Sequence, residues 1–151
     1  MAEIVIRGAE LADVDSLGDV FRRSSLSNEG DRPNLLASPD VLEFEPTAVH
    51  DRRCRVAIVE GRLVGFATVR PIGDGVELED LFVDPDWMRQ GIGLALVRDA
   101  TAMARASGVT RIEVTANPHA SEFYERAGFV PDGTAHTQFG PAPRMRLDLS
   151  R

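Results

Sequence analysis

The stretch Asp84–Leu96 reads DPDWMRQGIGLAL and joins two different sequence patterns. Before it, Val76–Val83 has the apolar spacing of a β-strand. After it, Gly91–Ser107 carries Ile92, Leu96, Ala100 and Met103 on one face at helical spacing. Pro85 ends the strand because proline has no backbone N–H to donate to a neighbouring strand. The stretch therefore predicts a strand, a glycine-containing turn and a helix, in that order.

The turn has the features of an anion-binding site. The first N–H groups of a helix have no partner inside the helix, and the helix dipole places about half a positive charge there. Glycine at positions 91 and 93 would let a phosphate approach the backbone closely, and Arg89 adds a full charge. The alternative is a plain tight turn. The amides expected to bind a diphosphate are those of Gln90, Gly91, Ile92, Gly93 and Leu94.

Composition limits the class of protein. A chain of 151 residues with 43% hydrophobic and 27% charged residues is typical of one globular domain, here 1–151. It has no apolar run near the roughly 20 residues of a membrane span, and acidic Glu3 does not suit a signal peptide. We therefore expect a cytoplasmic protein with no membrane partner. A net charge of -7 argues against nucleic-acid binding and favours cationic partners.

Several known site types are excluded by their motifs. The dinucleotide fingerprint needs a third glycine where this chain has Leu96, and the chain has no lysine for a P-loop. The single cysteine, Cys54, cannot form an internal disulfide; it is interpreted as a buried inert thiol, with a nucleophile as the alternative. His119 and His136 have no second ligand at metal spacing, so no metal site is expected.

Periodicity outside the turn predicts a mixed α/β (α+β) chain. Asp13 is expected to open a helix, Arg22–Ala37 to be a loop or broken helix, and Ser38–Pro39 to begin a short helix through Glu43. A further helix is expected at His119–Ala127. The remaining strands are expected at Glu3–Arg7, Cys54–Val59, Leu63–Val69, Arg111–Val114, Phe129–Val130 and Arg144–Leu149. Because a helix connects Val76–Val83 to Arg111–Val114, these two strands should be parallel.

Three motifs in a fixed order resemble those of the GNAT superfamily of N-acetyltransferases. They are a Leu-x-Val-x-Pro strand end at Leu81–Pro85, an Arg/Gln-x-x-Gly-x-Gly turn at Met88–Gly93, and an Asn-x-x-Ala-x-x-Phe-Tyr-x-x-x-Gly-Phe segment at Asn117–Phe129. The likeness covers Ile4–Leu149. It implies the GNAT fold, a central mixed and mostly antiparallel sheet of about six or seven strands flanked by about four helices. One position departs from the pattern, because Met88 stands where the family has Arg or Gln.

The resemblance implies an enzyme that moves an acetyl group from acetyl-CoA, its co-substrate, to a primary amine of a small molecule or peptide by direct transfer. The pantetheine arm would then lie along the backbone of Leu81, Phe82 and Val83, with the Leu81 amide polarising the acetyl carbonyl. The same motifs place Asn117, Phe123 and Arg126 at the cofactor. Asn117 could equally be a cap and Arg126 a solvated side chain. A homodimer is possible, since many relatives pair.

Proton transfer needs side chains, because an alkylammonium must lose a proton before it can attack. Glu77 and Glu79 share one strand face and align with positions where the family carries catalytic bases. The alternative is that they belong to a solvated acidic stretch. Tyr124 aligns with the family's general acid, which would protonate the leaving thiolate; the alternative is a core tyrosine.

Two other classes of function remain open. The first is a non-catalytic acyl-CoA sensor with the same fold, which would bind coenzyme A and release no thiol. The second is a drug- or nucleotide-binding protein in which Gly91 and Gly93 only form a turn. Such a protein would show no thermal shift with coenzyme A.

Overall fold

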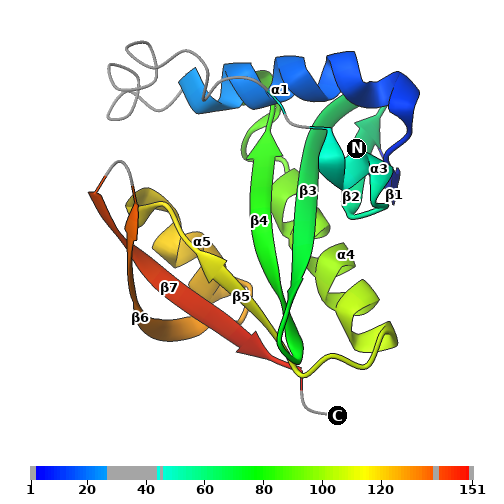
Figure 1. Cartoon of the computed structure of the whole chain (residues 1–151). Coiled ribbons are helices and arrows are strands. Elements are labelled where there is room, and N and C mark those ends of the chain that lie inside the picture. Colours follow the sequence, from blue (N-terminus) through cyan, green and yellow to red (C-terminus); the bar gives the residue numbers. More distant parts are fainter. Residues whose placement is uncertain (1–2, 27–43, 45, 138–139, 150–151) are drawn as a thin grey trace. The chain divides into compact units, whose positions relative to one another are not determined.

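The computed structural model describes residues 3–26, 44, 46–137 and 140–149. Its strands are β1 (Val5–Gly8), β2 (Cys54–Val59), β3 (Arg62–Ile72), β4 (Gly75–Val83), β5 (Arg111–Thr115), β6 (Val130–Thr137) and β7 (Gly140–Asp148). They form one seven-stranded sheet in the order β1-β2-β3-β4-β5-β7-β6 (Figure 1). Val76–Leu78 of β4 pairs in parallel with Ile112–Val114 of β5, and the β1–β2, β2–β3, β5–β7 and β6–β7 pairs are antiparallel. The predicted mixed sheet and its parallel pair are confirmed.

Four α-helices occur in the described residues: α1 (Val14–Leu26), α3 (Thr47–His50), α4 (Ile92–Ala106) and α5 (Ser121–Arg126). Short 3-10 turns precede three of them or lie close by: η1 (Leu11–Asp13), η3 (Pro85–Trp87) and η4 (Pro118–Ala120). The start of η1, which leads directly into α1, is fixed by a capping box, in which the Asp13 carboxylate accepts the Glu10 N–H at 2.8 Å. Gly108, with φ 82°, follows α4 in the left-handed conformation that ends helices.

The chain packs into two compact units. Unit 1 comprises Met1–Thr68 and Asp80–Leu96, and unit 2 comprises Val69–Glu79 and Val97–Arg151. Each unit therefore contains parts of β3, β4 and α4. The expectation of a single domain stays a prediction.

The core of unit 1 is aromatic. Phe66 is fully buried, and Phe82 lies 5.5 Å from it between ring centroids. Phe21 of α1 meets Phe82 edge to face at 5.1 Å, so α1 is fixed against the strands (Figure 1). Gly65 lets α4 pack closely, because a Cβ there would lie 3.1 Å from Ile92 Cγ2.

The strands of unit 2 separate apolar from charged side chains. Leu78, Ile112, Val114 and Met145 are all buried on one face. Since successive side chains of a strand point to opposite faces, the charged neighbours of these residues gather on the other face. The candidate bases Glu77 and Glu79 lie on that face.

The elements differ from the expectations in three places. Of the segment expected to be a loop or broken helix from Arg22, the described part continues α1 to Leu26, so no loop begins at Arg22. The sequence gave no signal for the four-residue α3. The strands expected at Phe129–Val130 and Arg144–Leu149 are longer than predicted, because β6 pairs with β7 from Thr134↔Pro143 to Thr137↔Gly140. The short helix expected after Ser38–Pro39 lies outside the described residues.

One side chain of α4 also differs from the expected stripe. Met103 was expected to face inward with Ile92 and Leu96, but it is 52% exposed. In the second half of the helix the buried side chains are Val97, Ala100 and Ala104, so the buried face is displaced around the helix and leaves Met103 outside. Among the described helices, none combines the length and apolar character needed to cross a bilayer.

Candidate active site

The predicted anion-binding turn has the expected backbone geometry. Arg89 and Gly91 are both left-handed, with φ 64° and 81°. The first helical hydrogen bond closes from the Ala95 N–H to the Gly91 carbonyl at 3.0 Å, so the amides of Ile92, Gly93 and Leu94 precede it in the first turn. A Cβ at Gly91 would meet nothing within 4 Å, and Arg89 and Gln90 are exposed. The turn is therefore open to a ligand. Met88, at the departing motif position, is 55% exposed.

The end of β4 leads into this turn through a capped 3-10 turn. The Asp84 carboxylate accepts the Asp86 N–H at 2.9 Å, and the Trp87 N–H donates to the Asp84 carbonyl at 2.8 Å. The Asp84 N–H donates to the Val64 carbonyl of β3 at 2.8 Å. Asp84 is only 6% exposed, which makes it the fixed point from which the turn starts.

The backbone direction of β4 can be read from the same contact. The N–H and C=O groups of alternate residues in a strand point to opposite edges. Asp84 points its N–H to β3, and the Phe82 carbonyl oxygen lies beside Gly65 of β3. Leu81 and Val83 consequently direct their N–H and C=O groups to the edge of β4 away from β3.

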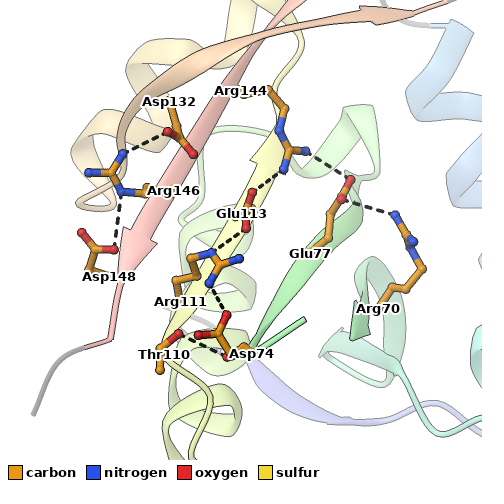
Figure 2. Close-up of polar contacts among 10 residues, drawn as sticks. All are labelled: Arg70, Asp74, Glu77, Thr110, Arg111, Glu113, Asp132, Arg144, Arg146 and Asp148. Atoms are coloured by element: carbon orange, nitrogen blue, oxygen red, sulfur yellow. Dashed lines mark hydrogen bonds and ion pairs between the residues drawn. The ribbon is translucent and has the colours of Figure 1, made fainter. Parts of the chain in front are cut away.

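The two candidate bases share one arginine. Arg70 Nε donates to Glu79 Oε2 at 3.1 Å, and Arg70 Nη2 donates to Glu77 Oε1 at 3.3 Å. This shared partner shows that both glutamates lie on one face of β4. Glu77 also pairs with Arg144 of β7 at 3.4 Å (Figure 2), and its side chain is 19% exposed. Glu77 is therefore an ion-paired, half-buried carboxylate and not part of a solvated stretch.

The ion pairs continue across unit 2 as a ladder, here defined as Arg70, Glu77, Glu79, Arg144, Glu113, Arg111 and Asp74. Arg144 Nη2 donates to Glu113 Oε1 at 2.6 Å, and Arg111 Nε donates to Glu113 Oε2 at 2.6 Å (Figure 2). The hydrogen bond from Arg111 is the main cause that holds the pKa of Glu113 below its ordinary value. Arg111 also binds Asp74, at the turn between β3 and β4.

Tyr124 is 6% exposed and lies between two rings. Its centroid is 5.1 Å from that of Phe123 and 5.4 Å from that of Phe129, both edge to face. Burial raises the pKa of the phenol above its usual range, so the hydroxyl keeps its proton at neutral pH. The environment fits a core tyrosine, and it also provides a permanently protonated donor.

The remaining motif residues lie around α5. Asn117 Oδ1 accepts the His119 N–H at 2.9 Å and caps η4, as the alternative interpretation expected. Phe123 is half-buried. Arg126 has a 79% exposed side chain, 3.7 Å from Glu122, which leaves it largely solvated. The cofactor roles of these three residues stay predictions.

A cavity of about 460 Å³ lies in unit 1 beside the capped turn. Its walls come from α1, from the turn between β2 and β3, and from η3. Its lining residues include Asp19, Arg23, Arg62, Asp84, Asp86 and Trp87. It therefore shares η3 with the approach to the anion-binding turn.

Sequence reasoning did not identify the arginines of the ladder. Arg70 had a usable signal, because a two-residue turn at Gly73–Asp74 would place it opposite Glu77. No local sequence signal points to Arg144, because it lies 67 positions after Glu77. Its pairing with Glu77 depends on the order of β4, β5 and β7 in the sheet. No group of three His, Cys, Asp or Glu side chains suited to a metal ion occurs in the part of the chain that the structure describes.

Comparison with known proteins relates this geometry to one family. The profile of the acetyltransferase (GNAT) family matches residues 19–129. A glucosamine 6-phosphate N-acetyltransferase of Trypanosoma brucei brucei is 29% identical over 134 residues, covering 77% of this chain and 83% of the relative. Serotonin N-acetyltransferase 2, chloroplastic, of Oryza sativa subsp. japonica is 30% identical over 136 residues, covering 87% of this chain and 63% of the relative.

Solved structures agree in fold. The PaiA N-acetyltransferase from Thermoplasma acidophilum, in complex with coenzyme A, superposes with a TM-score of 0.76 at 19% identity, covering 97% of this chain and 99% of that one. At this identity the likeness shows the fold alone. The family profile covers most of the chain, and the motif turn and the sheet topology agree with it. The chain therefore belongs to the GNAT family of acetyltransferases.

Proposed function

We propose that this protein transfers the acetyl group of acetyl-CoA directly to a primary amine of a small molecule or a peptide. The observation that carries the proposal is the open first turn of α4, with left-handed Arg89 and Gly91 before it, in a chain of the GNAT family. Bound acetyl-CoA would supply the reactive thioester. The rest of the proposal concerns what the chain's own residues contribute.

The turn fits a diphosphate. Unpaired amides at a helix start bind anions, and the lack of a side chain at Gly91 leaves open space where the phosphates would approach. Exposed Arg89 adds a full positive charge beside these amides. We assign Gln90, Gly91, Ile92, Gly93 and Leu94 to the diphosphate, with Arg89 as the charged partner.

The backbone of β4 fits the pantetheine arm. Leu81 and Val83 direct their groups to the edge away from β3, where an extended chain can add as a further strand would. On this edge the Leu81 N–H would stabilise the negative charge that develops on the acetyl oxygen. The Phe82 carbonyl lies against β3, so its proposed contact rests on the family resemblance alone.

Glu79 and Glu77 would take the proton from the amine, directly or through water. Glu79 is the better candidate, because its side chain is 33% exposed against 19% for Glu77, which two arginines bind. A carboxylate that already binds Arg70 can attract an ammonium only in competition with it. The acidic net charge of -7 still favours approach of a cationic acceptor.

Tyr124 would donate a hydrogen bond to the leaving thiolate. Because burial raises the pKa of the phenol, full transfer of its proton to a thiolate is uphill. A hydrogen bond that strengthens as the sulfur gains charge is the contribution that this geometry supports.

A thiol-release assay with acetyl-CoA and a panel of amines tests the proposal. We expect turnover with at least one amine, a loss of about 10- to 100-fold in kcat for Tyr124→Phe, and a larger loss for Glu79→Gln than for Glu77→Gln. If all three variants retain the wild-type rate at every pH, the role assignments are wrong. If wild type binds coenzyme A but releases no thiol with any amine of the panel, catalysis itself is contradicted.

That last result would favour the second candidate, a non-catalytic acyl-CoA sensor. One observation supports it: both candidate bases are already engaged by Arg70. A sensor would show thermal stabilisation by coenzyme A without thiol release.

A further inference from the structure

Arg23 of α1 forms a two-pronged contact that the proposed chemistry does not use. Its Nη1 donates to Asp84 Oδ2 at 2.9 Å, and its Nη2 donates to Asp86 Oδ2 at 2.8 Å. One guanidinium therefore holds a carboxylate immediately before η3 and a carboxylate inside it. We call Arg23, Asp84 and Asp86 the clamp.

The segment on which the clamp acts is also anchored at its first residue. Asp84 is anchored to β3 through its N–H and is buried. The Asp86 side chain is 76% exposed and Arg23 lines the open cavity, so ion pairing and not packing holds this part of the clamp. Arginine suits this task, because its planar fork reaches two carboxylates at once.

The segment that follows the clamp is the anion-binding turn itself. Only Met88 separates Trp87 of η3 from left-handed Arg89. A non-glycine residue keeps a left-handed conformation only where its surroundings impose it. Here the chain is held by η3 before Arg89, and after it by Ile92, whose side chain is buried at 2% exposure. The direction in which the turn presents its amides therefore depends on how η3 is held.

We propose that Arg23 is a positioning residue for the diphosphate-binding turn, acting through Asp84 and Asp86. The inference rests on the proposed function, because it assumes that the turn binds the diphosphate of coenzyme A. Without the guanidinium, buried Asp84 loses its cationic partner and η3 is no longer held to α1. The affinity for the diphosphate should then fall, while the steps at the thioester are unaffected.

Two acetyl donors distinguish a positioning role of Arg23 at the diphosphate-binding turn from a general loss of enzyme activity. Acetyl-CoA carries the diphosphate, and the acetyl thioester of N-acetylcysteamine lacks it. For Arg23→Gln we expect KM for acetyl-CoA to rise about 10- to 100-fold with kcat unchanged, and kcat/KM for the short thioester to stay at the wild-type value. Arg23→Lys should give a smaller rise in KM, because an ammonium cannot span both carboxylates as a fork.

The controls use exposed positions. Arg105→Gln changes an exposed arginine in the last turn of α4 and should leave KM for both donors unchanged. Asp86→Asn removes the ion pair between Arg23 and Asp86 at an exposed position. This second variant tests the proposal if Arg23→Gln does not fold. A rise of about threefold in KM for acetyl-CoA is expected for this variant.

The outcomes are distinct. An unchanged KM for acetyl-CoA in Arg23→Gln or Asp86→Asn, or an equal loss of kcat/KM with both donors, overturns the inference. Calorimetric titration of wild type with coenzyme A separates the two proposals. If wild type does not bind coenzyme A, the proposed function and the proposed role of Arg23 are both wrong. If wild type binds it and the variants bind equally well, the clamp alone is wrong.

Discussion

The candidate functional groups of the two units differ in kind. In unit 1 the groups are backbone amides, in the first turn of α4 and at Leu81 and Val83 on the edge of β4 away from β3. In unit 2 they are side chains: Glu77 and Glu79 in the ion-pair ladder, and Tyr124 between two rings.

This difference decides how each unit tolerates substitution. A backbone site depends on the path of the chain, so it is sensitive to residues that set close packing and insensitive to most side chains that line it. A site made of side chains depends on the hydrogen bonds and ion pairs that stabilise each charged group. Substitutions that change packing or the path of the chain, including those of the Arg23 clamp, should therefore act on unit 1. Substitutions that remove charges of the ladder should act on unit 2.

The largest expected effect is that of Gly65→Ala in unit 1. The new Cβ would lie 3.0 Å from the Phe82 carbonyl oxygen, 3.1 Å from Ile92 Cγ2 and 3.3 Å from Leu96 Cδ1. The Phe82 carbonyl is backbone of β4 and cannot rotate away, and the two side chains belong to the first turns of α4, so β4 or the start of α4 must shift. We expect the free energy of unfolding to fall by about 1–3 kcal/mol, with weaker binding of coenzyme A. Urea unfolding and calorimetric titration measure the two effects.

Gly18→Ala is the matched control. Gly18 lies inside α1, and a Cβ there would only reach ordinary contact with Phe44 at 3.9 Å. Alanine inside a helix is favoured over glycine, so this variant should gain about 0.5–1 kcal/mol. If both variants lose stability equally, close packing at Gly65 is not what fixes α4.

The same contrast explains what the sequence could predict. The turn, the strand before it and the helix after it lie within Asp84–Leu96 and its flanks, so local chemistry specified them. The contact between Glu77 and Arg144 could not be predicted locally, because Arg144 reaches Glu77 only through the strand order β4-β5-β7. The hairpin of β6 and β7 was predicted too short, since Pro131, Gly133 and Pro141 suggest a loop to any local rule.

The second prediction concerns the charges of unit 2. Arg144→Gln removes the cation that Glu77 and Glu113 share, and the carboxylates have side chains only 19% and 13% exposed. We expect a loss of about 1–3 kcal/mol in the free energy of unfolding, because half-buried carboxylates lose charge-assisted hydrogen bonds. Chemical denaturation tests this, with Arg105→Gln as the control. An equal change in both variants would mean that the ladder contributes nothing specific.

The third prediction follows from the lowered pKa of Glu113. Hydrogen bonds from Arg111 and then Arg144 favour its ionised form in the folded protein, so its folded pKa lies below the ordinary 4.5. The stabilisation is therefore complete above pH 4.5 and is lost as the pH falls through the folded pKa. Glu113→Gln should flatten the dependence of unfolding free energy on pH below this point. Denaturation at a series of pH values checks it, and an unchanged slope would contradict the assignment.

The smallest effect is expected for Cys54, which lies in the apolar core of unit 1. The thiol is 2% exposed, and burial is the main cause that raises its pKa to about 12. An aromatic disulfide reagent should therefore not label the native protein during a thiol-release assay, and should label it fully in urea. Cys54→Ala should leave turnover unchanged, since this thiol belongs to the cluster around Phe66. Rapid labelling of native protein would show that the core of unit 1 opens readily. The packing that fixes α4, and with it the amide turn, would then be far weaker than the contacts of Gly65 imply.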